Sequence, residues 1–186
     1  MAKLIVFNMV SLDGFFEGPD HDLDWHVTDE EFDLFAIEQL RQIGTILFGR
    51  KTYQMMAEYW PTQTAIEEDP VVADLMNSLP KVVFSRTLKS ANWANTELVQ
   101  GDSGKLVQEM KNSTDEDLIL FGSAELMNTL IKNNLVDEIR LMLNPVVLGR
   151  GQPLFSDPDL RLRLNLLNAR PFKSGNVLLN YEVAKG

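Results

Sequence analysis

Two stretches of the sequence place a glycine and then a hydroxyl residue directly after an apolar run, a pattern that can bind phosphate. They lie at residues 45–52 and 118–125, and both contain the string Leu-Phe-Gly; the glycines and hydroxyl residues are Gly49, Thr52, Gly122 and Ser123. Each apolar run indicates a buried strand, and a helix begins after each glycine. The first N–H groups of a helix lack partners within the helix and lie at the positive end of its dipole. The two junctions therefore predict sites for the two phosphates of one dinucleotide.

Basic residues follow two of the predicted strands. Arg50 and Lys51 come after Gly49, and Ser85 and Arg86 end another apolar run. Cations at a helix start oppose the helix dipole, so a bound anion would stabilise them there, and Arg presents a planar fork that matches phosphate. Ser85 and Arg86 are predicted to reach a further phosphate, such as the 2′-phosphate of NADPH. The alternative is that Arg50 and Lys51 only solubilise a helix start. Neither G-x-G-x-x-G after the first strand nor G-x-x-x-x-G-K-[ST] occurs, which disfavours a standard Rossmann or P-loop site.

Two carboxylates are candidates for acid–base chemistry. Asp13 follows the first predicted strand in the string Ser-Leu-Asp-Gly, and Asp24 lies beside Trp25. A carboxyl packed against an aromatic ring has a raised pKa and can donate a proton near neutral pH. Asp13 is equally well explained as an Asp-Gly turn residue, and Asp24 as a solvated loop acid.

The loop over residues 11–27 is the candidate substrate loop. The loop is long, and it contains Phe15, Phe16 and Trp25. Asn8 is the polar residue that interrupts the apolar strand before it. Long loops without regular structure are usually functional or disordered, and three aromatic residues argue against disorder. We expect Asn8, Phe15, Phe16 and Trp25 to line a substrate pocket, with ordinary packing under a loop as the equal alternative.

No metal site is predicted. Asp20, Asp22, Asp24 and Glu31 match positions 1, 3, 5 and 12 of a calcium loop, but Trp25 stands at the sixth position, where the turn needs glycine. The sequence also has no strong zinc spacing, although both histidines lie in this segment.

Composition limits the classes of function. The 186 residues carry a net charge of −10 and no cysteine, which excludes disulfides, thiol nucleophiles and thiolate metal sites. An acidic protein repels nucleic acid and anionic lipid, so neither is an expected partner. The N-terminal apolar run is too short for a signal peptide or a membrane span. We therefore expect a cytoplasmic protein that acts on a small molecule.

The elements needed to position these residues alternate between strand and helix. Strands are predicted at residues 3–10, 45–48, 81–87, 96–99, 118–121, 136–143, 160–169 and 176–183. Helices are predicted between them, the first of them with Thr28 as N-cap of a capping box closed by Glu31. The last two strands are joined by a hairpin turn. The pattern predicts a single α/β domain over residues 1–186, with a mostly parallel central sheet, helices on both faces and an antiparallel C-terminal hairpin.

Six motifs, taken in order, resemble the dihydrofolate reductase-like superfamily. They are Ser-Leu-Asp-Gly at 11–14, Phe-Gly-Arg-Lys-Thr-Tyr at 48–53, Val-Phe-Ser-Arg at 83–86, Phe-Gly-Ser-Ala-Glu-Leu at 121–126, Leu-Val-Asp-Glu-Ile at 135–139 and Pro-Val-Val-Leu-Gly-Arg-Gly-Gln-Pro-Leu-Phe at 145–155. The resemblance is closest to the reductase domain of the bifunctional riboflavin-biosynthesis deaminase-reductase and its stand-alone relatives. It covers residues 3–183 and implies a sheet of about eight strands of the α/β kind.

The resemblance implies NADPH as hydride donor, a reductase activity like that on 5-amino-6-(5-phosphoribosylamino)uracil, and a homodimer. It assigns the pyrophosphate and the adenosine phosphate to Gly49, Arg50, Lys51 and Thr52, and the adenosine end to Ser85 and Arg86. The other side of the pyrophosphate would be lined by Phe121, Gly122, Ser123, Ala124 and Glu125. Asp13 would lie near substrate and nicotinamide. The family often has a cis Gly-Gly bond where this chain has Gly122–Ser123, and its peptide geometry is left open.

The sequence departs from the pattern of the riboflavin enzymes in two ways that concern the substrate. The chain has no cysteine for a zinc deaminase domain, and Phe15-Phe16-Glu17-Gly18 is apolar and acidic where the riboflavin enzymes usually carry a small or basic stretch. This weakens the case for a phosphorylated substrate. The alternatives are dihydrofolate reductase activity, a nucleotide-binding module of the same fold without turnover, or a flavin-binding protein.

Overall fold

The computed structural model describes residues 1–184, which form one eight-stranded sheet and one two-stranded sheet. The large sheet has the order β5-β4-β3-β6-β1-β7-β10-β9, and β2 pairs with β8 in the small one. The strands are β1 (Leu4–Ser11), β2 (Phe15–Glu17), β3 (Ile43–Gly49), β4 (Lys81–Phe84), β5 (Thr96–Val99), β6 (Asp117–Phe121), β7 (Glu138–Asn144), β8 (Gln152–Pro153), β9 (Leu164–Pro171) and β10 (Val177–Val183). The first six strands in this order, β5 to β7, run parallel to one another, whereas β10 runs antiparallel to both β7 and β9.

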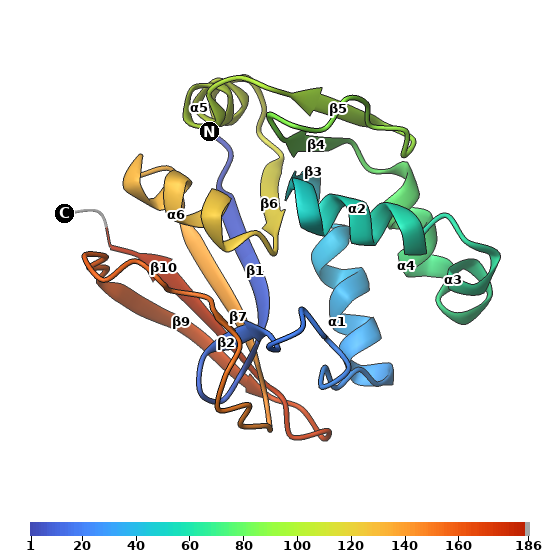
Figure 1. Cartoon of the computed structure of the whole chain (residues 1–186), viewed down its shortest axis with the longest axis vertical. Helices are drawn as coiled ribbons and strands as arrows, with labels where there is room; N and C mark the ends of the chain where they lie inside the picture. The colour runs from blue at the N-terminus through green and yellow to red at the C-terminus, as the bar shows by residue number, and fades with distance from the viewer. Residues whose placement is uncertain (185–186) are drawn as a thin grey trace.

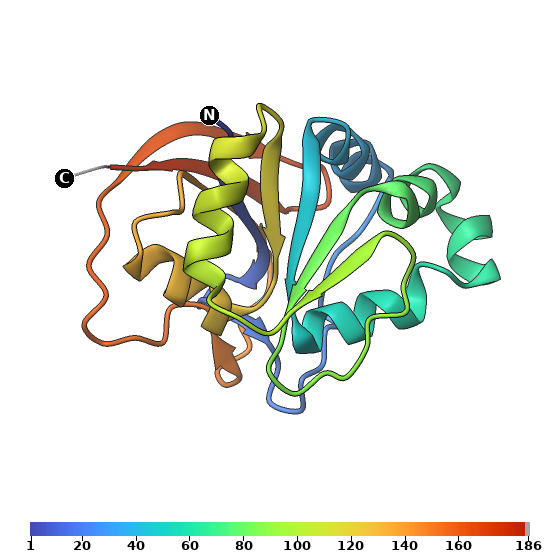
Figure 2. The same cartoon turned by 90° about the horizontal axis from the view of Figure 1, so that it is seen from above.

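Six helices connect these strands within residues 1–184. They are α1 (Glu30–Leu40), α2 (Arg50–Tyr59), α3 (Gln63–Glu68), α4 (Pro70–Ser78), α5 (Ser103–Ser113) and α6 (Ala124–Lys132). The β9–β10 hairpin lies on one side of the molecule and α2 to α4 on the other (Figure 1). Seen from above, α5 and α6 lie side by side (Figure 2).

The central strands are buried on both faces, which explains their continuous apolar runs. In β1, Ile5 and Phe7 pack into a core with α1, α2 and α4, whereas Leu4 and Val6 pack into a core with α5 and α6. Neighbouring β3 and β6 alternate in the same way. Because side chains alternate across a strand, each central strand contributes to two cores and the sheet is held between two helical layers.

The structure confirms the predicted fold class: a mostly parallel α/β sheet with an antiparallel C-terminal hairpin and helices on both faces. The N-cap of α1 was predicted wrongly. Asp29, not Thr28, takes that position, since its carboxylate accepts a hydrogen bond from the Phe32 N–H at 2.9 Å. No element was predicted at α3, β2 or β8, which are all short.

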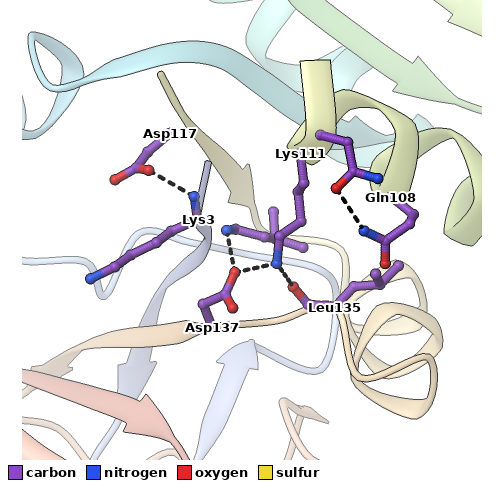
Figure 3. A network of polar contacts seen from close by, with 8 residues as sticks. Lys3, Gln108, Lys111, Asp117, Leu135 and Asp137 are labelled. Carbon is purple, nitrogen blue, oxygen red and sulfur yellow. Dashed lines mark hydrogen bonds and ion pairs between the residues drawn. The ribbon is translucent and has the colours of Figure 1, made fainter. Parts of the chain in front are cut away.

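A buried ion pair closes the end of the molecule at which the parallel strands begin (Figure 3). Lys111 of α5 is 5% exposed, and its ammonium group pairs with Asp137 and donates to the Leu135 carbonyl at 2.7 Å. The same Asp137 oxygen accepts from the Leu4 N–H at 2.8 Å. One carboxylate thus joins the start of β1, the end of α5 and the segment before β7.

No helix in the described residues 1–184 is long and apolar enough to cross a membrane.

Candidate active site

The two predicted phosphate junctions lie side by side at the carboxyl edge of the sheet. β3 and β6 are paired in parallel with Phe48 opposite Phe121, so α2 and α6 begin next to each other. A Cβ atom added at Gly122 would lie 2.7 Å from Thr52 Oγ1, and one added at Gly49 would overlap Ser123 Oγ. Each glycine therefore makes room for the hydroxyl side chain of the other junction, and the two helix starts form one unit.

The first turns of these two helices keep their backbone N–H groups free of side-chain caps. Within residues 1–184, the N-caps of α1, α3 and α5 accept a hydrogen bond from the helix that follows, whereas Gly49, Asp69 and Ser123, the N-caps of α2, α4 and α6, make no such bond. Gly122 and Ser123 have φ of +61° and +58°, the left-handed region, which costs a residue with a Cβ atom about 1 kcal/mol. The Gly122–Ser123 peptide is trans, as are all others in the described chain. Free amides at paired helix starts fit the two phosphates of a dinucleotide.

The predicted basic residues lie around this unit. Lys51 lines the adjoining cavity, and the exposed Arg50 guanidinium donates to Gln54 Oε1 at 3.0 Å. Phe84 pairs with Gly49, so Ser85 and Arg86 stand at the same edge, one strand further out. The Ser85 hydroxyl accepts from the N–H groups of residues 87 and 88. Ala124 and Glu125 form the first turn of α6.

A cavity of about 700 Å³ opens between α1, α2, β1 and the loop after β2. Six residues predicted for substrate or cofactor line it: Asn8, Phe16, Lys51, Thr52, Phe121 and Gly122. Most of the wall is apolar, with side chains from α1 and α2 such as Phe32, Met55, Met56 and Trp60. The cavity is large enough for a small-molecule ligand.

Two buried nitrogen atoms in the cavity wall have no hydrogen-bond partner among residues 1–184. They are Asn8 Nδ2 and His26 Nε2. Burial lowers the pKa of His26 to about 4, so the imidazole is neutral at physiological pH. The Trp25 ring packs edge-on against His26 with the ring centroids 4.4 Å apart. Trp25 itself does not line the cavity but orients the residue that does.

Val27 is fixed by two buried asparagines from the far end of the chain. Its N–H donates to Asn144 Oδ1 at 2.8 Å, and its carbonyl accepts from Asn176 Nδ2 at 2.7 Å. The two asparagines are 1% and 0% exposed. Since both backbone polar groups of Val27 are held, the position of the adjacent His26 depends on β7 and on the turn before β10.

Asp33 of α1 also lines the cavity, although it was not predicted as a site residue from the sequence. Burial raises the pKa of its carboxyl, and the nearby Asp69, Asp29 and Glu30 raise it further. The available signal was the helical spacing of Asp33, Ala36 and Leu40, three lining residues at i, i+3 and i+7. That spacing marks one face of α1, but only the tertiary structure shows that this face borders a cavity.

The structure places Asp13 and Asp24 outside the lining of this cavity. The Asp13 carboxylate accepts from Ser11 Oγ at 2.7 Å and from the N–H groups of Leu148 and Gly149 at 3.1 and 2.8 Å. These hydrogen bonds, with that of Ser11 largest, lower the pKa of Asp13. Asp13 thus holds the connection after β7, and the exposed Asp24 lies in the loop before α1. Phe15 belongs to β2 and is not among the lining residues.

Among the described residues, no group of three or more His, Asp or Glu side chains is arranged to hold a metal ion.

This combination of sheet order, paired helix starts and adjoining cavity defines a dihydrofolate reductase-like α/β protein. The family model of the RibD C-terminal domain matches residues 2–178, and the chain belongs to that family. It is 37% identical over 183 residues to the uncharacterized protein YyaP of Bacillus subtilis, covering 96% of this chain and 94% of that one.

Two solved structures show the same fold. One is a diaminohydroxyphosphoribosylaminopyrimidine deaminase/5-amino-6-(5-phosphoribosylamino)uracil reductase from Thermotoga maritima, at 13% identity and a TM-score of 0.69. The likeness covers 98% of this chain and 57% of that one. The other is a dihydrofolate reductase from Enterococcus faecalis in complex with NADP(H), at 14% identity and a TM-score of 0.66, covering 98% and 97%.

Proposed function

We propose that the protein is an NADPH-dependent reductase that passes hydride to a C=N or C=O carbon of a small heterocyclic or sugar-linked pyrimidine substrate. The observation that carries the proposal is the pair of uncapped helix starts, α2 and α6, beside a ring-sized cavity. Membership of the RibD C-terminal domain family supports a reductase in the manner of riboflavin biosynthesis. The dihydrofolate reductase complex supports a nicotinamide cofactor in this fold.

The residues of the two junctions fit the phosphates of NADPH. The free amides of α2 and α6 would donate to phosphate oxygens, as would the hydroxyls of Thr52 and Ser123. Arg50 and Lys51 would neutralise the phosphate charge, and Ser85 and Arg86, one strand further out at the same edge, would reach a further phosphate. NADPH supplies the hydride when bound.

The protein's own part in the reaction is to position the substrate, exclude water and provide one proton. We favour Asp33 over Asp13 and Asp24 as the carboxyl beside the substrate, because Asp33 alone of the three lines the cavity and has a raised pKa. Asp13 is held as a carboxylate by three hydrogen bonds. The apolar side chains of Phe32, Met55 and Trp60 exclude water from the cavity.

Cofactor titration followed by turnover tests the proposal. NADPH should bind the purified protein, and its oxidation should be stimulated by at least one member of a panel of pyrimidine-ribosyl and pterin substrates. Asp33→Asn should then lower turnover more than Asp13→Asn, with NADPH affinity retained in both. Tight NADPH binding without turnover on any substrate would favour the non-catalytic binding module, and absence of NADPH binding contradicts both.

We further propose a homodimer, as the resemblance to the reductase domains implies. Sedimentation velocity should give twice the mass of the 21.1 kDa chain. A monomer at concentrations that support turnover would refute this assembly.

A further inference from the structure

One face of the C-terminal, antiparallel part of the sheet is built from apolar side chains. Because side chains alternate across a strand and the strands are in register, every second residue of β7, β10 and β9 points to the side on which α6 packs against Ile139. We call this surface the leucine face, and its members are Leu141, Leu143, Leu166, Val177, Leu179 and Tyr181. None of them is charged.

The charged residues of the same strands point to the opposite face. Glu138 and Arg140 of β7 form an ion pair there at 2.6 Å, and Asn168 and Arg170 of β9 share that side. An antiparallel sheet with one face in water normally presents its polar residues to the water. The apolar composition of the leucine face is therefore that of a covered surface.

The leucine face is only partly covered within residues 1–184. Leu166 is 56% exposed and the other five members are half-buried, although β7 and β10 are interior strands of the sheet. Helix α6 covers the same side further along β7, where Ile139 is fully buried, and the β9–β10 hairpin extends away from that helix (Figure 1). An apolar surface that is continuous and open in this way marks a site of interaction.

The charge of the chain indicates which partner fits this surface. The net charge of −10 makes two copies repel each other, and it also opposes contact with an anionic membrane surface. The leucine face lets two copies meet without bringing carboxylates together. A two-fold axis then places the same apolar residues on both sides of the contact, so the face is complementary to itself.

Pairing of two copies through the free edge of β9 is less suitable. The pairing of β9 with β10 passes from Asn168 to Leu166, so Leu167 forms a bulge in the middle of the edge strand. A bulge bends the strand and interrupts the row of backbone groups that a further strand would need. Contact through the face of the sheet has no such obstacle.

We propose that a second copy of the chain packs its leucine face against this one, with the two sheets face to face across a two-fold axis. Sheets packed in this way lie about 10 Å apart and interdigitate their side chains. The inference rests on the homodimer proposed above and assigns its interface.

Sedimentation velocity of two matched variants tests the interface. Leu166→Glu should raise the dissociation constant of the dimer about a hundredfold or more, because the two-fold axis buries two unpaired carboxylates at once. Asn168→Glu is the control, since it adds the same charge to the opposite face of β9 at an exposed position and should leave the dimer intact. Circular dichroism should show that both variants are folded. A Leu166→Glu protein that dimerises as tightly as wild type overturns the inference.

Thiol protection tests the same contact without disrupting it. The chain has no cysteine, so Leu179→Cys and Asn168→Cys each introduce a single thiol. The thiol of Leu179→Cys should react with a maleimide about tenfold or more slowly in the dimer than after dilution to monomer, because the core of an interface excludes solvent. The thiol of Asn168→Cys should react at the same rate at both concentrations. The same dependence on dilution for the two thiols contradicts the interface.

The results for the interface and for the proposals above are distinguishable. A wild-type chain that is monomeric at every concentration refutes the homodimer and the interface together, while NADPH binding and turnover decide the reductase separately. A dimer that persists in Leu166→Glu, with a freely reactive thiol in Leu179→Cys, keeps the homodimer and refutes the leucine face as its interface.

Discussion

At the scale of single residues, the site separates positive charge from negative charge. Arg50, Lys51 and Arg86 stand at the ends of β3 and β4, where Lys51 also reaches the cavity, whereas Asp33 and Asp69 border the cavity from α1 and the start of α4. The protein carries a net charge of −10, so its few cations at the helix starts are the local exception to an acidic field. This distribution of charge supports the proposal that the helix starts hold the phosphates of a cofactor.

The cofactor assignment predicts a specific pattern of lost affinity. The double change Arg50→Ala with Arg86→Ala should weaken NADPH binding by about tenfold or more and NADH binding by less, since a 2′-phosphate is present only in NADPH. Isothermal titration of both cofactors measures the difference. Lys89→Ala, an exposed cation after β4, serves as the control and should change neither affinity substantially. Equal losses for NADPH and NADH would remove Arg50 and Arg86 from recognition of the 2′-phosphate.

His26 predicts a dependence of stability on pH. Its pKa is about 4 in the folded protein and 6.5 in the unfolded chain, so the unfolded chain binds the proton more readily between these values. The free energy of unfolding should therefore fall by about 2 kcal/mol from pH 7 to pH 5 on account of this residue. His26→Gln should reduce the fall by that amount in urea unfolding curves recorded at both pH values.

His21→Gln provides the matched control for this measurement. His21 is exposed and pairs with Glu17, so its replacement leaves His26 in its buried environment. The raised pKa of Asp33 acts in the opposite sense, because a folded state that binds the proton more tightly gains stability as pH falls. Because Asp33 is present in both proteins, its effect cancels when the fall in the free energy of unfolding is compared between His26→Gln and wild type. An equal fall in wild type and His26→Gln would show that His26 is not the responsible group.

At the scale of elements, the two strand–helix junctions depend on each other. Gly49 has φ of −81°, a value that any residue adopts, so its requirement for glycine comes from the Ser123 side chain packed against it. Ser123 in turn holds a left-handed conformation that disfavours a side chain. Gly49 is therefore constrained by the space left beside Ser123, and Ser123 is constrained by its own backbone conformation.

A double-mutant cycle tests this coupling. Gly49→Ala should destabilise the protein by about 1–3 kcal/mol, because its Cβ atom would overlap Ser123 Oγ. In a Ser123→Gly background the same change should cost less than about 1 kcal/mol, since the overlapping atoms are gone. Urea unfolding of the four proteins measures the coupling. Gly101→Ala is the control, because nothing lies within 4 Å of an added Cβ there. Additive effects of Gly49→Ala and Ser123→Gly would contradict the contact.

The elements themselves were largely predictable, because their signals are local. Apolar runs and helical spacing identified the central strands and five of the six helices in the described part of the chain. β2 and β8 were not predictable, since two- and three-residue strands exist only through pairing between Phe15 and Pro153, far apart in sequence. Trp25 rather than His26 was predicted to line the pocket. A loop has no regular repeat in its sequence that indicates which of two neighbouring side chains faces a cavity.

At the scale of the whole molecule, the buried ion pair and the proposed active site lie at opposite ends of the parallel strands. The Lys111–Asp137 pair closes the amino ends (Figure 3), and the paired helix starts and the cavity lie at the carboxyl ends. Ligands bind at the carboxyl ends of strands in open α/β sheets. Changes at the first end should therefore affect folding and leave binding intact.

Lys111→Met tests this separation. It should lower the free energy of unfolding by about 3 kcal/mol, because it leaves the Asp137 carboxylate without its buried cation. The affinity for NADPH, measured on the folded fraction at low temperature, should stay unchanged. Lys105→Met, an exposed cation on the same helix, should cost no more than about 0.5 kcal/mol. A loss of NADPH affinity in Lys111→Met would show that the two ends are coupled.

The two asparagines that hold Val27 have a consequence for exchanging specificity between relatives. Asn144 and Asn176 lie more than one hundred residues after the loop whose position they fix. A chimaera that receives only residues 11–28 from a relative acquires new loop chemistry but keeps anchors matched to the old backbone. Transferring substrate preference therefore requires moving three separate segments together: the loop, the end of β7 and the turn before β10.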